Sequence, residues 1–544
     1  MHADLLFTGG PVLTPEGPTA AAVAVTGERI TAVGSAGELR ELAGPRTEVV
    51  DLAGRLLLPG FQDAHVHPVP AGLELTQCDL TGPRTAEETV AAVRAYAGAH
   101  PERAWILGGG WSMEAFEGGT PTKELLDAVV PDRPVYLPNR DHHGAWVNSR
   151  ALELAGIGRD TPDPADGRID RDASGAPSGT LQEGAMQLVG RLAPPAAPAD
   201  RLAALLHAQR HLHALGITAW QDALVGGFLG MDDPSEAYLT AARDGSLTAR
   251  VVGALWWDRE RGAEQIPELV AKRAALSHGR FRAGTVKLML DGVAENGTAA
   301  LLDPYLDKCG CATRNRGKSF LDPRQLPQYV AALDALGFQC HFHALGDRAV
   351  RDALDAVEAA RAANGPSDTR PHLAHLQVVH PADIPRFARL GATATIQALW
   401  AAHEPQMDEL TIPFLGPERA GRQYPFGSLL RSGARLAGGS DWPVSSPDPL
   451  QGIHVAVNRV EPGGDAPVFL PGERLGLGDA IRAYTAGSAY VNHLDDTGRV
   501  AVGALADLVV LDRDPFTAPP EHIADTQVAH TYVGGARVYS AEEA

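Results

Sequence analysis

Cysteine is scarce in this chain of 544 residues, which contains only four. They are Cys78, Cys309, Cys311 and Cys340, too few for a disulfide scaffold and wrongly spaced for a zinc ribbon. No run of 18 apolar residues occurs, which argues against a membrane span. The first residues lack a basic segment followed by an apolar core, so we expect no signal peptide and a reducing, cytoplasmic setting.

Basic residues are in the minority, with 47 Lys and Arg against 67 Asp and Glu and a formal net charge of −20. This sign argues against nucleic acid or an anionic membrane as a partner. Apolar residues make up 44% of the chain, which is enough for a large packed core. We therefore expect a globular protein with a small-molecule substrate, and homo-oligomer formation stays open.

The two ends of the chain share one pattern. Short strand-like segments separated by glycine-containing turns fill residues 1–57 and recur in residues 495–544. Because chain termini often lie close together, we predict that both ends form one composite β-sandwich.

The central region, residues 58–494, alternates apolar strands with amphipathic helices, the pattern of a parallel sheet. Strands buried on both faces predict a (β/α)₈ barrel of the TIM type within an α/β fold. The eight predicted strands are residues 56–67, 216–222, 250–256, 285–291, 338–344, 372–377, 392–397 and 435–441. The interval between the first two is far longer than a connecting loop needs, which predicts an inserted subdomain over about residues 76–195.

A His-x-His pair, His65 and His67, ends the first predicted strand. Side chains two positions apart on a strand share a face, so both point to the same side. We predict that this pair binds one metal ion.

Four more polar residues end later strands: Lys287, His343, His375 and Asp441. A barrel keeps its chemistry at these carboxyl-terminal strand ends. Neutral imidazoles with carboxylates suit a divalent metal, zinc above all, although iron, manganese and cobalt are compatible.

Two of these residues have alternative explanations. Lys287 lies in an apolar strand, where an ammonium group is costly to bury. It is either a snorkelling or ion-paired lysine, or a neutral amine that takes up carbon dioxide as a carbamate and bridges two metal ions. Asp441 is either a cap or turn carboxylate or a general base beside the metal.

Aromatic residues gather at the same mouth of the predicted barrel. Trp256, Trp400 and Trp442 end strands three, seven and eight, while Trp111 and His143 belong to the insertion. As substrate contacts they favour an apolar or aromatic substituent. The alternatives are core packing for the tryptophans and a loop-stabilising hydrogen bond for His143.

Six motifs together carry a family resemblance. They are residues 59–67, 286–292, 343–349, 375–377, 439–443 and 503–510. With these motifs the chain resembles the amidohydrolase superfamily, and within it the YtcJ-like branch that includes N-substituted formamide deformylases.

The resemblance implies hydrolysis of an amide-type C–N bond by a metal-activated hydroxide. It implies His65, His67, Lys287, His343, His375 and Asp441 as metal ligands, with a carbamate on Lys287. Asp441, Lys287 and His343 are then the catalytic residues, with Asp441 moving the proton.

Two segments depart from the branch, residues 291–298 and the loop at residues 307–316. Both belong where substrate should bind, and Asp291 is predicted as a substrate contact. Two other functions stay open: deamination or cyclic-amide opening on the same scaffold, and a catalytically silent small-molecule binding protein.

Overall fold

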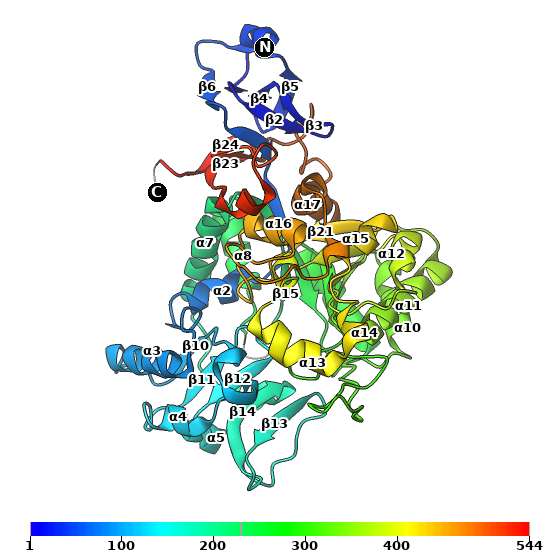
Figure 1. Cartoon of the computed structure of the whole chain (residues 1–544). Coiled ribbons are helices and arrows are strands. Elements are labelled where there is room, and N and C mark those ends of the chain that lie inside the picture. Colours follow the sequence, from blue (N-terminus) through cyan, green and yellow to red (C-terminus); the bar gives the residue numbers. More distant parts are fainter. Residues whose placement is uncertain (1, 229–230, 543–544) are drawn as a thin grey trace.

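A computed structural model describes residues 2–228 and 231–542 of the chain. Figure 1 shows three parts: a barrel in the middle, a β-sandwich above it that holds both termini, and an inserted sheet with helices below. The barrel sheet has eight strands in the order β8-β15-β16-β17-β18-β19-β20-β21. Each pair of neighbouring strands in this order is parallel.

The barrel strands have these bounds: β8 Phe61–Val66, β15 Ile217–Val225, β16 Arg250–Trp256, β17 Phe281–Met289, β18 Gln339–Ala344, β19 His372–His375, β20 Thr393–Ile396 and β21 Arg435–Gly438. Each is followed or preceded by a helix on the outside. These helices are α7 Pro198–Ala214, α8 Ser235–Asp244, α9 Ile266–Ala275, α10 Leu326–Ala335, α11 Asp347–Asn364, α12 Ile384–Leu390, α15 Phe426–Arg431 and α16 Pro449–Asn458.

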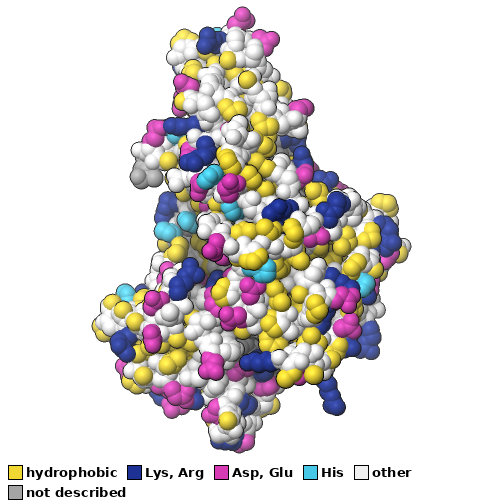
Figure 2. Space-filling model, in the orientation of Figure 1, with side chains coloured by type: hydrophobic (Ala, Val, Ile, Leu, Met, Phe, Trp, Pro, Cys, Tyr) yellow, Lys and Arg dark blue, Asp and Glu magenta, His cyan; other side chains and the backbone are white. Residues whose placement is uncertain are grey.

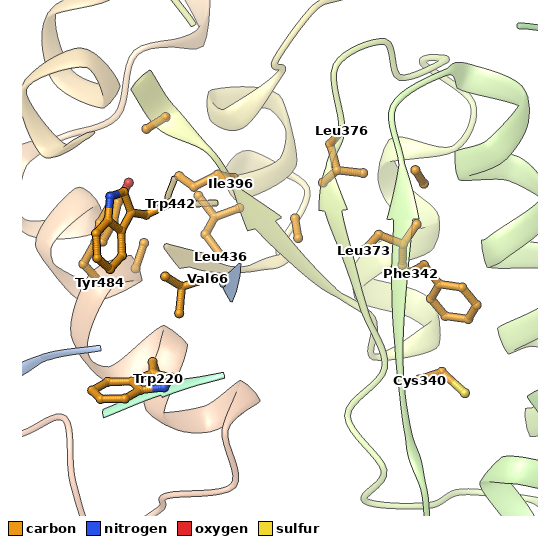
Figure 3. Close-up of a cluster of buried hydrophobic side chains, with 14 of the residues drawn as sticks. Val66, Trp220, Cys340, Phe342, Leu373, Leu376, Ile396, Leu436, Trp442 and Tyr484 are labelled. Carbon is orange, nitrogen blue, oxygen red and sulfur yellow. The ribbon is translucent and has the colours of Figure 1, made fainter. Parts of the chain in front are cut away.

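The barrel closes between its first and last strands. The amide of Asp441, just after β21, donates a hydrogen bond of 2.7 Å to the carbonyl of His65 in β8. Apolar side chains fill the layer between strands and helices, and Figure 3 shows Phe342, Leu373 and Leu376 in this layer. The predicted (β/α)₈ class is confirmed.

The sandwich combines both ends of the chain. One sheet has four strands, β5-β4-β1-β6, and the other has six, β24-β23-β22-β7-β2-β3. Their bounds are β1 Leu5–Thr8, β2 Pro11–Thr14, β3 Gly17–Ala20, β4 Ala22–Thr26, β5 Arg29–Gly34, β6 Glu48–Asp51, β7 Leu56–Pro59, β22 Leu508–Leu511, β23 Val528–Val533 and β24 Ala536–Ser540. The two sheets pack through Phe7 and Tyr532, whose rings meet edge to face with centroids 5.1 Å apart.

The prediction of one strand over residues 56–67 is wrong. Residues Leu56–Pro59 form β7, which pairs antiparallel with β22 in the sandwich, and the barrel strand starts only at Phe61. Gly60 separates the two strands, and its amide donates to the carbonyl of Asp507 at 2.8 Å. A Cβ atom on Gly60 would lie 2.4 Å from the Thr218 side chain, so the chain crosses from sandwich to barrel where only glycine fits.

The insertion follows β8 and a short helix, α2 Pro68–Glu74. It is built on a six-stranded sheet in the order β13-β14-β12-β11-β10-β9. The strands are β9 Cys78–Asp79, β10 Ile106–Gly109, β11 Val135–Pro138, β12 Gly144–Val147, β13 Gly167–Arg171 and β14 Pro177–Glu183. Its helices are α3 Ala86–Ala99, α4 Lys123–Asp127 and α5 Ser149–Ala155.

The surface carries both signs of charge. Figure 2 shows acidic and basic side chains interspersed over the visible face. In the described part of the chain, no helix is both long and apolar enough to cross a bilayer.

Candidate metal centre

Three side chains meet where the barrel closes. The Nε2 atoms of His65 and His67 each lie 3.1 Å from Oδ1 of Asp441. One potential ligand atom from each residue lies within 4.8 Å of the others. Among residues 2–228 and 231–542, no other three His, Cys, Asp or Glu side chains come together so closely.

The backbone around this cluster is held in unusual conformations. Asp441 and His375 have φ angles of 58° and 81°, in the left-handed region that residues with a Cβ atom rarely adopt. Asp63 braces the cluster, because its carboxylate accepts the amides of His65 at 2.9 Å and Ser440 at 3.1 Å. Such strain persists only where the surrounding structure enforces it and is typical of functional sites.

Lys287, His343 and His375 line the same small cavity as the cluster, with a volume of about 70 Å³, which we call the central cavity. Nζ of Lys287 lies 3.3 Å from Nε2 of His65. Nδ1 of His375 lies 3.9 Å from Oδ2 of Asp441, and its ring centroid lies 4.4 Å from that of His343. The structure therefore brings all six predicted metal ligands to one place.

His375 gives a direct test of whether these residues fit a metal ion. Its side chain is 1% exposed, and neither ring nitrogen has a hydrogen-bond partner among the described residues. Leaving buried polar atoms unsatisfied is costly, so native proteins rarely do it. A divalent metal ion would satisfy one of these nitrogens, and the imidazole and carboxylate donors around it suit such an ion.

Electrostatics favour the ligand forms of these groups. Burial lowers the pKa of the His343 and His375 imidazoles well below the usual range, which keeps them neutral. Burial opposes ionisation of Asp441, but the adjacent His65 and His67 hold its pKa well below its usual range. Burial also lowers the pKa of Lys287 to about 7, so a large fraction of this amine is uncharged at neutral pH.

Asp291, predicted as a substrate contact, is not among the residues that line the central cavity. Its carboxylate is fully buried and accepts three backbone amides, those of Ala300, Leu345 and Gly346. One of its oxygens lies 3.3 Å from Nδ1 of His343. Asp291 therefore fixes the loop behind His343.

His341 supports the centre from the barrel interior. Its Nε2 lies 2.8 Å from Nδ1 of His65, and its Nδ1 lies 2.7 Å from Oε1 of Gln221. A second partner on the far nitrogen fixes the tautomer and ring position of a ligand histidine.

Two predicted tryptophans lie near the centre. Trp256 lines the central cavity and stacks on Phe228 with centroids 4.1 Å apart. Trp400 stacks on the His375 ring at an interplanar angle of 13° and lines an adjoining cavity.

The other two tryptophans do not reach the central cavity. Trp111 is 1% exposed within the core of the insertion, where its indole donates to the carbonyl of Leu137 at 2.7 Å. Trp442 follows a ligand but turns its ring into the apolar layer, and Figure 3 shows it there with Tyr484. It lines the adjoining cavity instead of the central one. Strand-end position predicted the neighbourhood of Trp442 but not the direction of its side chain.

His143 reaches the central cavity from the insertion, together with a residue that the sequence did not indicate. Its Nδ1 lies 2.9 Å from Oε2 of Glu183, and its ring centroid lies 5.4 Å from that of His343. Glu183 is fully buried, has a φ of 52° and also accepts the Thr298 hydroxyl at 2.6 Å. Burial alone would lower the pKa of His143, but the Glu183 carboxylate raises it to about 9. The pair thus presents a positively charged donor to the cavity.

We predict that Glu183→Gln keeps the metal content but lowers kcat by about 10- to 100-fold, as loss of a residue supporting a site commonly does. Without the carboxylate, only Asp141 and Asp441 still oppose the effect of burial, so the pKa of His143 falls and the ring loses its charge at a lower pH than in the wild type. Any activity that needs the charged ring survives only at lower pH, and the alkaline limb of the pH–rate profile shifts downward. The exposed Glu153→Gln is the matched control, and an unshifted profile in Glu183→Gln would contradict the role.

The family model described as the amidohydrolase family matches residues 48–539. The chain belongs to the amidohydrolase family. The putative amidohydrolase YtcJ of Bacillus subtilis is 32% identical, with 99% of this chain and 98% of that protein covered. The N-substituted formamide deformylase of Arthrobacter pascens is 29% identical, with 98% of both covered. The resemblance to the YtcJ-like branch is confirmed.

A solved structure of another amidohydrolase-like chain agrees with the fold. The metal-dependent hydrolase from Pyrococcus furiosus, whose own function is uncharacterised, superimposes with a TM-score of 0.71 at 26% identity. The match covers 94% of this chain and all of that one. The protein is therefore a hydrolase of a metal-dependent family.

Proposed function

We propose that the protein hydrolyses the C–N bond of a small N-substituted amide, with a formamide as the simplest case. The convergence of His65, His67 and Asp441 beside the unpaired His375 carries this proposal. The formamide deformylase among the relatives supports the choice of bond. The proposed ion is zinc, because neutral imidazole and carboxylate donors are its usual ligands.

The shape of the central cavity supports a small acyl group. Its volume of about 70 Å³ leaves little room beside the metal ligands. Apolar side chains form much of the remaining wall: Leu224, Phe228, Met231, Trp256 and Met289. A formyl or similarly small acyl group fits this space, with an apolar or aromatic N-substituent along the wall.

The chemistry divides between the ion and the chain. A divalent ion held by the ligands named above would polarise the substrate carbonyl and make water more acidic. Asp441 accepts a proton from the attacking water and delivers it to the leaving nitrogen. His143, charged through Glu183, donates a hydrogen bond toward the carbonyl oxygen, where negative charge develops. The apolar wall limits access of bulk water.

Hydrolysis of N-benzylformamide by the zinc-loaded protein tests the proposal. We expect formate and benzylamine in equal amounts, both measured by chromatography. Turnover should be lost after chelation and recovered when zinc is added. N-benzylpivalamide is the matched control, because its acyl group is too bulky for the central cavity and should react far more slowly. Turnover of neither amide, together with ammonia release from an aminated heterocycle, would refute amide hydrolysis in favour of deamination.

A further inference from the structure

A second cavity adjoins the central cavity. It has a volume of about 490 Å³ and shares three wall residues with the central cavity, Asp141, Pro443 and Val444. Trp400 stands between the two spaces, with one face on the His375 ring. The volume lies within the range of small-molecule sites. A substrate whose acyl group lies at the metal ligands can therefore extend into this second space, which we call the acidic cavity.

Negative charge dominates the wall of the acidic cavity. Six carboxylates line it: Glu74, Asp79, Asp141, Glu295, Glu404 and Glu461. Two arginines line it, Arg84 and Arg140. Arg140 already forms an ion pair outside this wall, with its Nη2 2.7 Å from Oε1 of Glu114. Within the described residues, no Lys or Arg nitrogen forms an ion pair with Glu295 or Glu404.

An independent feature of the wall also indicates a missing donor. Gln377 lines the cavity and is 1% exposed, yet its Oε1 has no hydrogen-bond partner among the described residues. Its Nε2 is already directed to Gln423 at 3.3 Å. A bound molecule that carries an N–H or O–H group can satisfy this buried acceptor. The aromatic side chains of Trp400 and Tyr424 on the same wall are suited to a cation as well.

Two carboxyl groups of the acidic cavity, Glu404 and Glu295, have raised pKa values, as expected for buried acids with little positive charge nearby. Burial raises the pKa of Glu404 to about 7, with Arg140 opposing and Glu461, Glu114 and Glu295 adding to the shift. Burial also raises the pKa of Glu295, and the nearby Asp141 adds to it. A bound cation would restore full ionisation of both groups.

We propose that the acidic cavity binds a cationic end group, an ammonium or guanidinium, carried by the substrate's N-substituent. This inference rests on the proposed function, because the cationic group is assigned to the N-substituent of the amide substrate. The apolar stretch of such a substituent passes Pro443 and Val444, which both cavities share, and its charged end lies among Glu295, Glu404 and Gln377. An anionic end group is repelled by the same wall, so the site discriminates by the sign of charge.

Equilibrium binding tests the site without any reaction. Benzylammonium, benzyl alcohol and phenylacetate are titrated into the zinc-loaded full-length protein by calorimetry at pH 7, where the amine is protonated and cannot ligate metal. We expect benzylammonium to bind at least about tenfold more tightly than benzyl alcohol, a gain in keeping with a desolvated cation on an aromatic and acidic wall. Glu404→Gln should abolish that advantage, while Glu409→Gln, an exposed neighbour on the same segment, should keep it.

Kinetics then connect the site to the reaction. Three N-benzylformamides are compared, with a 4-aminomethyl, a 4-hydroxymethyl or a 4-carboxyl group, and we expect kcat/KM to fall in that order. In Glu404→Gln, kcat/KM for the aminomethyl compound should come closer to that for the hydroxymethyl compound. Equal affinity of benzylammonium and benzyl alcohol, or undetectable benzylammonium binding, would overturn the cationic site. Tighter binding of phenylacetate to chelator-treated protein, where its carboxylate has no zinc to ligate, would do the same. Selective benzylammonium binding without hydrolysis of any formamide would instead leave the site standing and refute the proposed function.

Discussion

Asp441→Asn is expected to lower kcat by about 10³-fold, within the range that a general base contributes. The asparagine keeps the size of the side chain and one oxygen toward the histidines at 3.1 Å, so the fold persists. It cannot accept the proton that the attacking water must lose. Steady-state kinetics with N-benzylformamide, metal analysis and circular dichroism measured on the same preparation would separate lost chemistry from lost metal or lost fold.

The matched control for this substitution is Asp465→Asn, on an exposed loop. It should leave kcat, metal content and the circular dichroism spectrum unchanged. Near-normal turnover of Asp441→Asn would show that the aspartate only caps the turn after β21, the alternative that the sequence left open.

Lys287→Ala is expected to reduce bound metal from about two equivalents to about one and to lower turnover strongly. The reason is the position of the amine, 4% exposed and 3.3 Å from Nε2 of His65, with a pKa lowered by burial to about 7. In that state the nitrogen can add to the carbon of carbon dioxide and lose one proton, which gives a carbamate with two oxygen ligands. Elemental analysis of wild type and variant measures the difference.

Carbon dioxide itself provides a second readout for Lys287. Metal reconstitution of the wild-type protein in buffer purged of carbon dioxide should give low activity that added bicarbonate restores. Lys272→Ala, at an exposed helical position, should behave as wild type in both experiments. An unchanged metal content in Lys287→Ala, with no bicarbonate effect, would show a mononuclear centre and leave Lys287 as a buried neutral amine.

The barrel could be predicted from sequence because its signals are local. Mostly buried segments that carry a polar side chain close to their C-terminal end mark strands such as β17 and β18, and the parallel arrangement then brings Lys287 and His343 together. The strand ends of a barrel form one face, so residues far apart in sequence converge there without any knowledge of their contacts. Strand-end position thus predicted that the six candidate ligands lie together, and the structure places them around one cavity. Their roles stay predictions.

The direction in which individual side chains point could not be predicted from the sequence. Trp111 and Asp291 occupy the expected segments but turn inward, one to fill the insertion's core and the other to hold three amides. Glu183 carried no signal, because its role arises from a strained backbone in the insertion that places it on His143. Spacing along one strand cannot encode a contact that forms only when two distant segments of the insertion, here β12 and β14, pair in a sheet.

The six-stranded sheet that unites the chain ends has a consequence for synthesis of the protein. Strand β7, joined through Gly60 to the strand that bears His65 and His67, finds its antiparallel neighbour β22 only near the end of the chain. Contacts of such long sequence separation form late and slow folding. During synthesis β7 can pair with β2 and β8 with β15 early, but the side of β7 that faces β22 stays unpaired until residues Leu508–Leu511 have been made. The six-stranded sheet is therefore completed only by the C-terminal strands β22, β23 and β24.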